Sequence, residues 1–340
     1  MKKLMCVCAI AFVACTSFGD AVKFGVLVLD SQTNLPVPGA GIKAGFEEDR
    51  GVWSRDRYKC TFKQYVSDSN GYARVQGTSN NGEAGATIVS AEGYYTPAHS
   101  DIPRFRKKNL FGVWQPDDLV VTIKLQRVEH PIPLWVKKEL LNVKQEITNI
   151  TGEKFSYDLM MGEWLPPLGK GKVADIEFTR IPHQEFAEVV GASGVKGRPY
   201  RDAVAVKFMG ADNGLVESHI PSRAYLKVRA APEEGYNPDY LCWEGKDDDL
   251  RHSTNYDRNR CFCFRIRTQR NENGQVKKAY YGKIYGDIVA YTGSDHAVFG
   301  VLFTYYLNPT SLDRNLEWDR VHNLCPNPGD VGDHVGDRQP

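Results

Sequence analysis

Residues 22–46 have the sequence VKFGVLVLDSQTNLPVPGAGIKAGF, and this stretch decides the fold class. Val22 to Asp30 is a run of apolar and β-branched residues, which is typical of a strand. Ser31 to Ala40 contains two prolines and a glycine, so it predicts a turn. Gly41 to Phe46 then begins a second strand. The chain therefore opens as strand, turn and strand, which indicates a β-sheet protein.

Short strands and turns continue to residue 125. Tyr65-Val66 leads into the turn Asp68-Ser69-Asn70-Gly71, and Tyr72 to Val75 alternates like the partner strand. Ala84 to Ala91 and Leu119 to Leu125 are the next strand patterns. Strands at this spacing predict a β-sandwich over residues 20–128.

Three motifs in this segment resemble those of carboxypeptidase-regulatory-like domains, which are transthyretin-like. They are Leu35-Pro36-Val37-Pro38-Gly39-Ala40 after a strand that ends in Asp30, then Ser67-Asp68-Ser69-Asn70-Gly71, then Ala91-Glu92-Gly93-Tyr94. The resemblance implies a seven-stranded, Ig/transthyretin-like sandwich that serves as a stalk, spacer or adhesion module and has no catalytic residues. The segment His99 to Asp118 departs from the family as an insertion.

The rest of the chain predicts a second domain over residues 129–325. Pro131-Ile132-Pro133 breaks the chain and is expected to form the linker. Leu134 to Ile147 fits either an amphipathic helix or a strand. Asn271-Glu272-Asn273-Gly274 predicts a hairpin turn. The expected fold is all-β, a sandwich or jelly roll, with strands at Val173–Phe178, Ala203–Phe208, Ala224–Arg229, Phe262–Thr268, Tyr280–Tyr285 and Val298–Leu307.

Two further segments, Tyr157-Asp158-Leu159 and Trp164-Leu165-Pro166-Pro167, resemble uncharacterised exported bacterial proteins, and that similarity implies no function. Residues 326–340 consist largely of Gly, Asp and Pro, so we expect a disordered tail.

The first nineteen residues predict export. Met1-Lys2-Lys3 is basic, Leu4 to Cys15 is apolar, and small residues precede a cleavage site after Gly19. Lipoprotein processing at Cys15 is the alternative. No later segment has the apolar length of a membrane span, so we expect a periplasmic, extracellular or cell-surface protein without a transmembrane segment.

Charge identifies no partner for the chain. Lys and Arg number 43 against 42 Asp and Glu, a net charge of +1. Nucleic-acid binding needs a basic excess to neutralise phosphates. We therefore expect no nucleic-acid partner.

Five of the eight cysteines follow the predicted signal peptide. Cys261 and Cys263 should share one face of a strand, and a bridge from either to Cys242 or Cys325 is the expected pairing. A zinc site would need Cys-x-x-Cys spacing, which is absent, so no metal is predicted. Cys60 near Lys59 and Lys63 is either a thiol nucleophile or a plain surface cysteine.

Other polar motifs have simple structural interpretations. Gly169-Lys170-Gly171-Lys172 lacks the phosphate-loop spacing and predicts a turn. Asp175 and Glu177 should share a solvated strand face, although paired carboxylates can cleave glycosides. Asp247-Asp248-Asp249 is expected to be solvated rather than a calcium site. No catalytic residue or cofactor is predicted.

Aromatic residues in loops are the remaining functional signal. Aromatic ring faces suit sugars, because they cover the apolar C–H surface of the sugar ring. Core packing explains the same residues. The sequence thus predicts a non-enzymatic envelope or secreted protein with a structural or recognition role, with envelope proteins or glycans as partners. The alternative is a carbohydrate-binding or carbohydrate-active second domain with contacts at Trp164, Tyr236, Tyr240 and Trp243.

Overall fold

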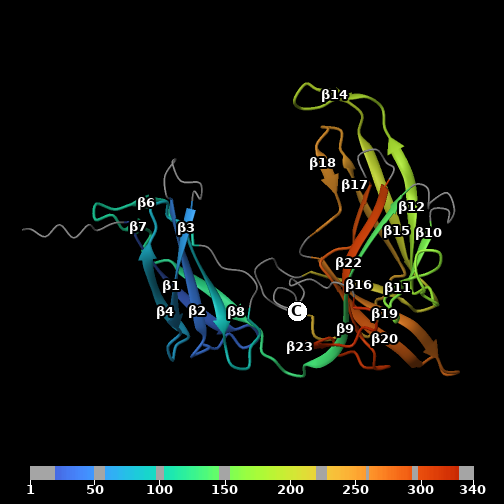
Figure 1. The fold of residues 1–340 in the computed structure, drawn as a ribbon, viewed down its shortest axis with the longest axis horizontal. Coiled ribbons are helices and arrows are strands. Elements are labelled where there is room, and N and C mark those ends of the chain that lie inside the picture. Colours follow the sequence, from blue (N-terminus) through green and yellow to red (C-terminus); the bar gives the residue numbers. More distant parts are fainter. Residues whose placement is uncertain are drawn as a thin grey trace, which may run out of the picture. The chain divides into compact units, whose positions relative to one another are not determined.

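The computed structural model describes residues 20–49, 58–96, 103–144, 154–219, 228–257, 260–292 and 298–328. The chain divides into two compact units, Met1–Leu125 and Gln126–Pro340 (Figure 1). All regular secondary structure among the described residues is β-strand, which confirms the all-β fold class. The predicted signal peptide, the Cys15 alternative and most of the predicted tail lie outside the described residues.

The first unit contains two three-stranded sheets. In one sheet β1 (Ala21–Asp30) pairs antiparallel with β4 (Tyr72–Thr78) and parallel with β8 (Val120–Leu125). In the other, β2 (Gly41–Asp49) lies between β3 (Tyr58–Val66) and β5 (Ala84–Ser90). Within the described residues these sheets hold six strands, where the resemblance implies seven. A separate ribbon occupies part of the predicted insertion and pairs β6 (Lys107–Lys108) with β7 (Trp114–Gln115).

The core of the first unit follows the two-residue period of its strands. Phe24 and Val26 of β1 and Ile42 and Phe46 of β2 are fully buried. Phe46 touches the opposite sheet, because a Cβ added at Gly77 of β4 would lie 2.6 Å from its ring. The two sheets therefore pack face to face as a sandwich.

The sequence motifs of the first unit meet through hydrogen bonds. The buried Asp30 carboxylate accepts the amides of Gln32 and Thr33 at 2.9 and 3.0 Å, and the Tyr94 hydroxyl at 3.0 Å. The buried Ser67 hydroxyl donates to the Val37 carbonyl at 2.8 Å. Each motif thus fastens a turn to the body of the sandwich.

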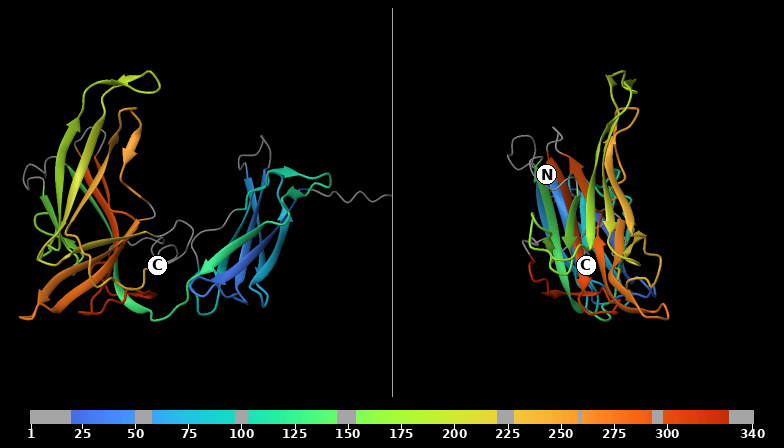
Figure 2. Two further views of the ribbon diagram at one scale, coloured as in Figure 1. Left: turned by 180° about the vertical axis from the view of Figure 1, so that it is seen from behind. Right: turned by 90° about the vertical axis from the view of Figure 1, so that its right-hand side faces the viewer.

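The second unit contains a six-stranded and a seven-stranded sheet, the two layers seen from two sides in Figure 2. The six-stranded sheet has the order β11 (Glu163–Trp164), β10 (Lys154–Asp158), β12 (Ile176–Glu185), β15 (Tyr200–Phe208), β17 (Asp239–Lys246) and β18 (His252–Thr254). The seven-stranded sheet has the order β16 (Gly214–His219), β19 (Arg260–Arg270), β20 (Val276–Tyr285), β22 (Val298–Asn308), β9 (Ile132–Lys144) and β23 (Trp318–Asn323), with β21 (Val289–Thr292) also on β22. A small hairpin pairs β13 (Val189–Val190) with β14 (Lys196–Gly197).

The core of the second unit lies between these sheets and is rich in aromatic residues. Tyr157 and Phe178 come from one sheet and Phe303 and Tyr305 from the other, and all four are buried. The ring centroids of Tyr157 and Phe303 are 5.5 Å apart in an edge-to-face contact. Of the two predicted architectures, the second unit is therefore a sandwich.

The start of the second unit bears on two local predictions, the linker at Pro131–Pro133 and the choice between helix and strand at Leu134–Ile147. The linker prediction at Pro131–Pro133 is wrong, because β9 begins at Ile132 and the Ile132 amide donates to the Glu317 carbonyl at 2.8 Å. Proline is tolerated there because it lies near the beginning of the strand. Leu134–Ile147 is compatible in sequence with a helix or a strand, and its described part is strand.

The remaining strand predictions hold with shifted ends, except one. The predicted strand at Ala224–Arg229 lies mostly outside the described residues, and its last two residues are not in a strand. The hairpin at residues 271–274 joins β19 to β20, with the Gly274 amide donating to the Asn271 carbonyl at 2.9 Å.

Candidate functional site

A buried ionic cluster joins the two sheets of the second unit. Asp158 ends β10, Asp175 directly precedes β12, and Arg267 lies on β19 of the other sheet. Arg267 Nε and Nη2 each lie 2.9 Å from an oxygen of Asp175, and Nη2 is 2.6 Å from Asp158 Oδ1. Both carboxylate side chains are 1–2% exposed. This geometry is a bidentate guanidinium–carboxylate clamp across the sandwich.

The remaining lone pairs of the cluster are also used. Asp158 Oδ2 accepts the amides of Lys172 and Val173 at 3.1 and 3.0 Å. Asp175 Oδ2 accepts the Leu159 amide at 2.9 Å. Burial raises the pKa of Asp175, and the hydrogen bonds and charge of Arg267 oppose that rise. The cluster therefore holds two loops as well as two sheets.

The prediction that Asp175 and Glu177 share a solvated strand face is wrong. Asp175 is 2% exposed rather than solvated, because the strand begins one residue later and its carboxylate turns to Arg267. Glu177 is partly exposed and pairs with Lys154 at 3.1 Å. The two carboxylates therefore have different partners and form no acid–base pair.

Arg267 reaches the cluster through an irregularity in β19. Its φ is +53°, and the β19–β20 register shifts between Ile266 and Gln269. A β-bulge of this kind redirects a side chain that regular alternation would send elsewhere. The sequence offers one signal for it, namely Arg265 and Arg267 directly after the apolar run Cys261 to Phe264.

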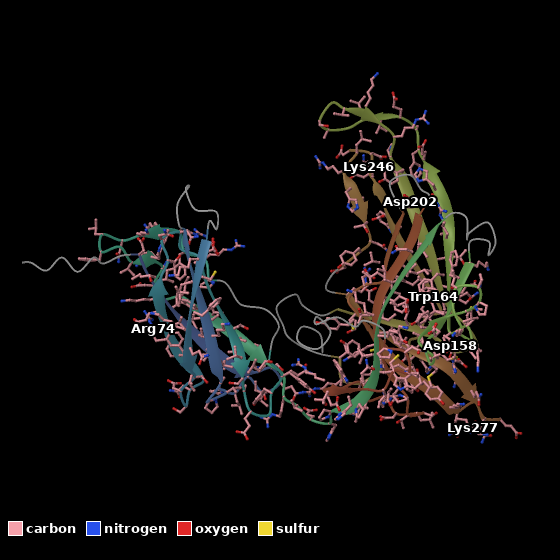
Figure 3. All side chains as sticks on the ribbon, in the orientation of Figure 1. Arg74, Asp158, Trp164, Asp202, Lys246 and Lys277 are labelled. Atoms are coloured by element: carbon pink, nitrogen blue, oxygen red, sulfur yellow. The ribbon has the colours of Figure 1, made fainter. Side chains whose placement is uncertain are left out.

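A second polar cluster crosses the sandwich at Glu139 of β9. Its carboxylate accepts the Tyr157 hydroxyl and the Trp164 indole N–H, each at 2.9 Å. Lys137 Nζ lies 3.4 Å from the same carboxylate. Figure 3 shows Trp164 and Asp158 in one half of the unit, with Asp202 and Lys246 nearer the other end. The two clusters thus concentrate in the same half of the unit.

A third cluster surrounds Asp287. Arg260 Nη1 lies 2.7 Å from Asp287 Oδ2 and 2.6 Å from the Tyr240 hydroxyl, and that hydroxyl donates to Asp287 Oδ1 at 3.1 Å. Burial raises the pKa of Asp287, against the opposing charge of Arg260. This cluster connects Tyr240 of β17 with Arg260 at the start of β19 and with Asp287 in the segment between β20 and β21.

Lys283 is the most deeply buried cation of the described residues. Its ammonium donates to the carbonyls of Val228 and Leu316 at 3.0 and 2.8 Å. Burial lowers the pKa of Lys283 to about 8. Its contacts are backbone carbonyls, so this lysine fastens two covering segments to the outer face of the seven-stranded sheet.

The four predicted aromatic contact residues do not form one surface. Trp164 is 6% exposed and packs on Tyr157 with ring centroids 4.9 Å apart. Core packing, the other explanation of these aromatic residues, therefore holds for Trp164, whose indole completes the core and bonds Glu139. Tyr240 packs edge-to-face on Phe262 inside the sandwich, with centroids 4.9 Å apart. Tyr236 packs against the cluster on the opposite side of the seven-stranded sheet.

Trp243 alone lies on the outer face of the six-stranded sheet. Its neighbour Cys242 points into the core, so alternation places Trp243 outward, beside Ala203 on β15. The Arg201 guanidinium lies 4.5 Å from the centre of the indole. Contact with a sugar at this one position stays a prediction.

The described cysteines are all unbonded. Cys242 faces the inter-sheet core, whereas Cys263 belongs to the cluster on the other side of the seven-stranded sheet. A Cys242–Cys263 bridge would have to pass through that sheet, so this predicted pairing is wrong. Burial raises the pKa of Cys261 to about 12 and of Cys263 to about 11, which keeps both thiols unreactive.

Cys60 is exposed on β3 of the first unit. It faces Glu47 across the ladder, on the opposite side of the strand from Lys59 and Lys63. The two cations on which the alternative of a thiol nucleophile depends therefore point to the other face.

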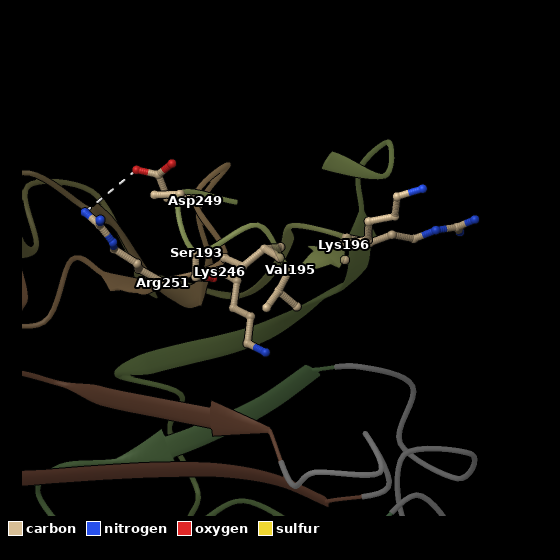
Figure 4. Close-up of a pocket in the computed structure, with 10 residues that line it drawn as sticks. Ser193, Val195, Lys196, Lys246, Asp249 and Arg251 are labelled. Atoms are coloured by element: carbon tan, nitrogen blue, oxygen red, sulfur yellow. Dashed lines mark ion pairs between the residues drawn. The ribbon is translucent and has the colours of Figure 1, made fainter. Parts of the chain in front are cut away.

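A surface cavity of about 600 Å³ lies between the β13–β14 hairpin and the β17–β18 turn (Figure 4). Lys196, Arg198, Lys246 and Arg251 contribute to its lining, and Asp249 pairs with Arg251 at 3.7 Å. In Figure 4 the Lys196 side chain extends away from Asp249 and Arg251. The cations therefore do not converge on one point.

The loop motifs behave as turns. Lys172 of the Gly-Lys-Gly-Lys segment gives its amide to Asp158, and Asp247 accepts the amides of Asp249 and Arg251. Among the described residues, no three His, Cys, Asp or Glu side chains come together as a metal site. The described part of the chain also contains no helix long and apolar enough for a membrane span.

No protein-family model and no curated protein matches the chain. Solved structures of bacterial pilins show a distant likeness. The C-terminal domain of the shaft pilin SpaA from Lactobacillus rhamnosus GG is 14% identical, with a TM-score of 0.22 over 32% of this chain and 98% of that one. The minor pilin of Streptococcus agalactiae is 19% identical, with a TM-score of 0.23 over 34% of this chain and 48% of that one.

The major pilin subunit of Bacillus cereus is 12% identical and covers 76% of this chain and 92% of that one, with a TM-score of 0.21. TM-scores this low carry no argument about function. The assignment of the two sandwiches rests on the strand pairing and the cores described above.

Proposed function

We propose that this chain is an exported, non-enzymatic protein with a structural or recognition role in the cell envelope or outside the cell. The supporting observation is how the larger unit uses its buried charges. Asp158, Asp175 and Arg267 bond one another across the sandwich, and Lys283 bonds two backbone carbonyls. Groups engaged in this way stiffen a scaffold and are not free to exchange protons with a substrate.

The resemblance of the first unit to carboxypeptidase-regulatory-like domains supports the same proposal. Asp30, Ser67 and Tyr94 of its motifs each have a structural hydrogen bond. A stalk or spacer needs compact units that stay folded, and motifs that fasten turns serve that need.

Export and the absence of turnover can be tested together. The tagged full chain is expressed in the organism that encodes it, and the product is fractionated and its intact mass measured. We expect a product that lacks residues 1–19, in the envelope or the medium. A cytoplasmic product that keeps Met1 would contradict export. Hydrolysis of any member of a glycoside and peptide substrate panel by the purified protein would contradict the non-enzymatic role.

Carbohydrate recognition is the second candidate, favoured by one observation, the outward position of Trp243 on the six-stranded sheet. A glycan array with the purified protein tests it. Binding that Trp243→Ala abolishes and Leu241→Ala retains would support this candidate, since Leu241 lies exposed on the same face. Binding that both variants retain would remove Trp243 from the proposal.

A further inference from the structure

Among the residues that the structure describes, the edge of β3 in the first unit is open. β3 ends the sheet order β3-β2-β5, and the described residues place no strand on its other side. Next to it, the Ser67 amide donates to the Ala40 carbonyl at 3.0 Å. Hydrogen-bonded pairs alternate along an antiparallel ladder, so the next residues of β3 whose backbone groups bond to β2 are Tyr65, Lys63 and Thr61. The backbone groups of Cys60, Phe62, Gln64 and Val66 therefore point away from β2.

The side chains of these four residues form an uncharged, exposed row. Phe62 is 60% exposed and Val66 is 67% exposed, and Cys60 and Gln64 are exposed as well. The Phe62 ring lies over Gly45, where an added Cβ would be 3.1 Å from it. The Lys43 ammonium is 4.3 Å from the ring centroid. The strand thus presents an exposed aromatic ring beside backbone groups that no other described strand pairs with.

The edge of β4 in the same unit is blocked. The Tyr65 hydroxyl accepts the Gln76 amide at 3.2 Å and donates to the Gln76 carbonyl at 2.7 Å. Lys63 Nζ donates to the same carbonyl at 3.2 Å. Side chains of β3 thereby occupy backbone groups through which another strand could pair. Among the described residues, side chains cover backbone groups at the edge of β4, and no such cover is found at the edge of β3.

We propose that β3 is a self-association edge, on which β3 of a second copy pairs antiparallel about a two-fold axis through Phe62. A two-fold interface must be self-complementary. Phe62 is the middle residue of the nine-residue strand, so this axis pairs the whole strand. It sets Phe62 opposite Phe62, Cys60 opposite Gln64, and Lys63 opposite Thr61.

Charge selects this register over its neighbours. An axis through Thr61 would set Lys59 opposite Lys63, and an axis through Lys63 would set Lys63 opposite itself. Like charges directly opposite each other destabilise a strand pair. A shift of one residue in the pairing instead sets outward backbone groups against inward ones and loses the hydrogen bonds. A second copy is the proposed partner because, in this register, each residue of β3 lies opposite a compatible residue of the same strand.

Sedimentation of the full chain over a dilution series tests the association. We expect a reversible dimer, and Phe62→Lys should raise its dissociation constant by at least about tenfold, because a charge on an edge strand opposes pairing. The matched control is Val89→Lys, which adds the same charge at an exposed position on β5 and should leave the dimer unchanged. A wild-type chain that is monomeric at every concentration, or a dimer that Phe62→Lys leaves intact, overturns the proposal.

A cross-link tests the register independently of affinity. With the native Cys60 in place, Gln64→Cys should give, on mild oxidation, a covalent dimer with two reciprocal disulfides, because opposed residues of a hydrogen-bonded pair are about 5.5 Å apart at Cα. The same substitution with Cys60→Ser should give none. A cross-linked dimer that forms without Cys60, or no cross-link with it, overturns the two-fold axis at Phe62.

Discussion

Among single residues, those with buried charges contribute most to the stability of this protein. The Arg267 guanidinium pairs with two carboxylates that are almost completely withdrawn from water. Removing one partner of a buried ion pair leaves the others uncompensated, which costs far more than the loss of a surface pair. The exposed pair Arg270–Asp212 provides the comparison within the same strand.

Arg267→Ala is expected to lower the free energy of unfolding of the second unit by about 3 kcal/mol. Arg270→Ala should lower it by less than about 1 kcal/mol, because its ion pair is solvated. Urea denaturation followed by tryptophan fluorescence measures both variants. Equal losses in the two variants would show that the clamp does not stabilise the sandwich.

Asp30 gives the first unit a defined acid response. Burial raises its pKa, but hydrogen bonds from Thr33, Gln32 and Tyr94 outweigh that effect and lower the pKa to about 2 from 3.8. The ionised form therefore stabilises the fold above pH 3.8, and this contribution is lost as the pH falls toward 2. We expect the stability difference between wild type and Asp30→Asn to be constant above about pH 5 and to shrink below about pH 4. Thermal melts between about pH 2 and pH 7 measure this stability difference. A difference that grows on acidification would contradict the predicted direction of the pH dependence.

Trp164 and Trp243 separate core packing from surface exposure. Trp164→Ala should cost about 3 to 5 kcal/mol, because it empties core volume and removes one of the hydrogen-bond donors to Glu139. Trp243→Ala should cost less, since its indole lies on the outer face of a sheet. Chemical denaturation of the two variants decides the order, and a larger loss for Trp243 would contradict the placement of both rings.

At the level of elements, the turns determine how the strands of the first unit connect. Gly71 and Gly39 both have a left-handed backbone, with φ of +69° and +71°. A Cβ at Gly71 would also lie 2.4 Å from the Val28 carbonyl oxygen, whereas nothing lies within 4 Å of one at Gly39. The turn at Gly39 therefore has backbone strain alone, whereas the turn at Gly71 combines backbone strain with a steric conflict.

Gly39→Ala should destabilise the first unit by about 1 kcal/mol, the cost of a left-handed alanine. Gly71→Ala should destabilise it by clearly more, because the added methyl group must displace β1 or the turn. Thermal melts of the two variants compare these costs. Similar melting temperatures would mean that the backbone around Gly71 moves aside without cost.

The whole molecule consists of two units with separate cores, Met1–Leu125 and Gln126–Pro340. Compact units with separate hydrophobic cores are able to unfold separately. The buried network of one unit should therefore have no influence on the stability of the other.

Scanning calorimetry of the full chain should show two transitions. Arg267→Ala is expected to lower only one of them, and Gly71→Ala only the other. The double variant should lower each transition by the same amount as the corresponding single variant, since the sites share no partners. A single transition that responds to both substitutions would show that the units unfold as one.

Alternation of apolar residues and Gly- and Pro-rich turns are sufficient to determine the all-β class and most of the strands. These signals are local, because a strand shows its period within about six to ten residues. The paired sheets also follow from them, since strands with one apolar face must cover it.

Tertiary structure alone decided which side chains meet across the sandwich. Asp158, Asp175 and Arg267 come from separate parts of the chain, and Arg267 reaches its partners only through a bulge that breaks the alternation. The same limit explains Trp164 and the cysteines, because the face of a sheet on which a residue lies depends on the exact register of its strand.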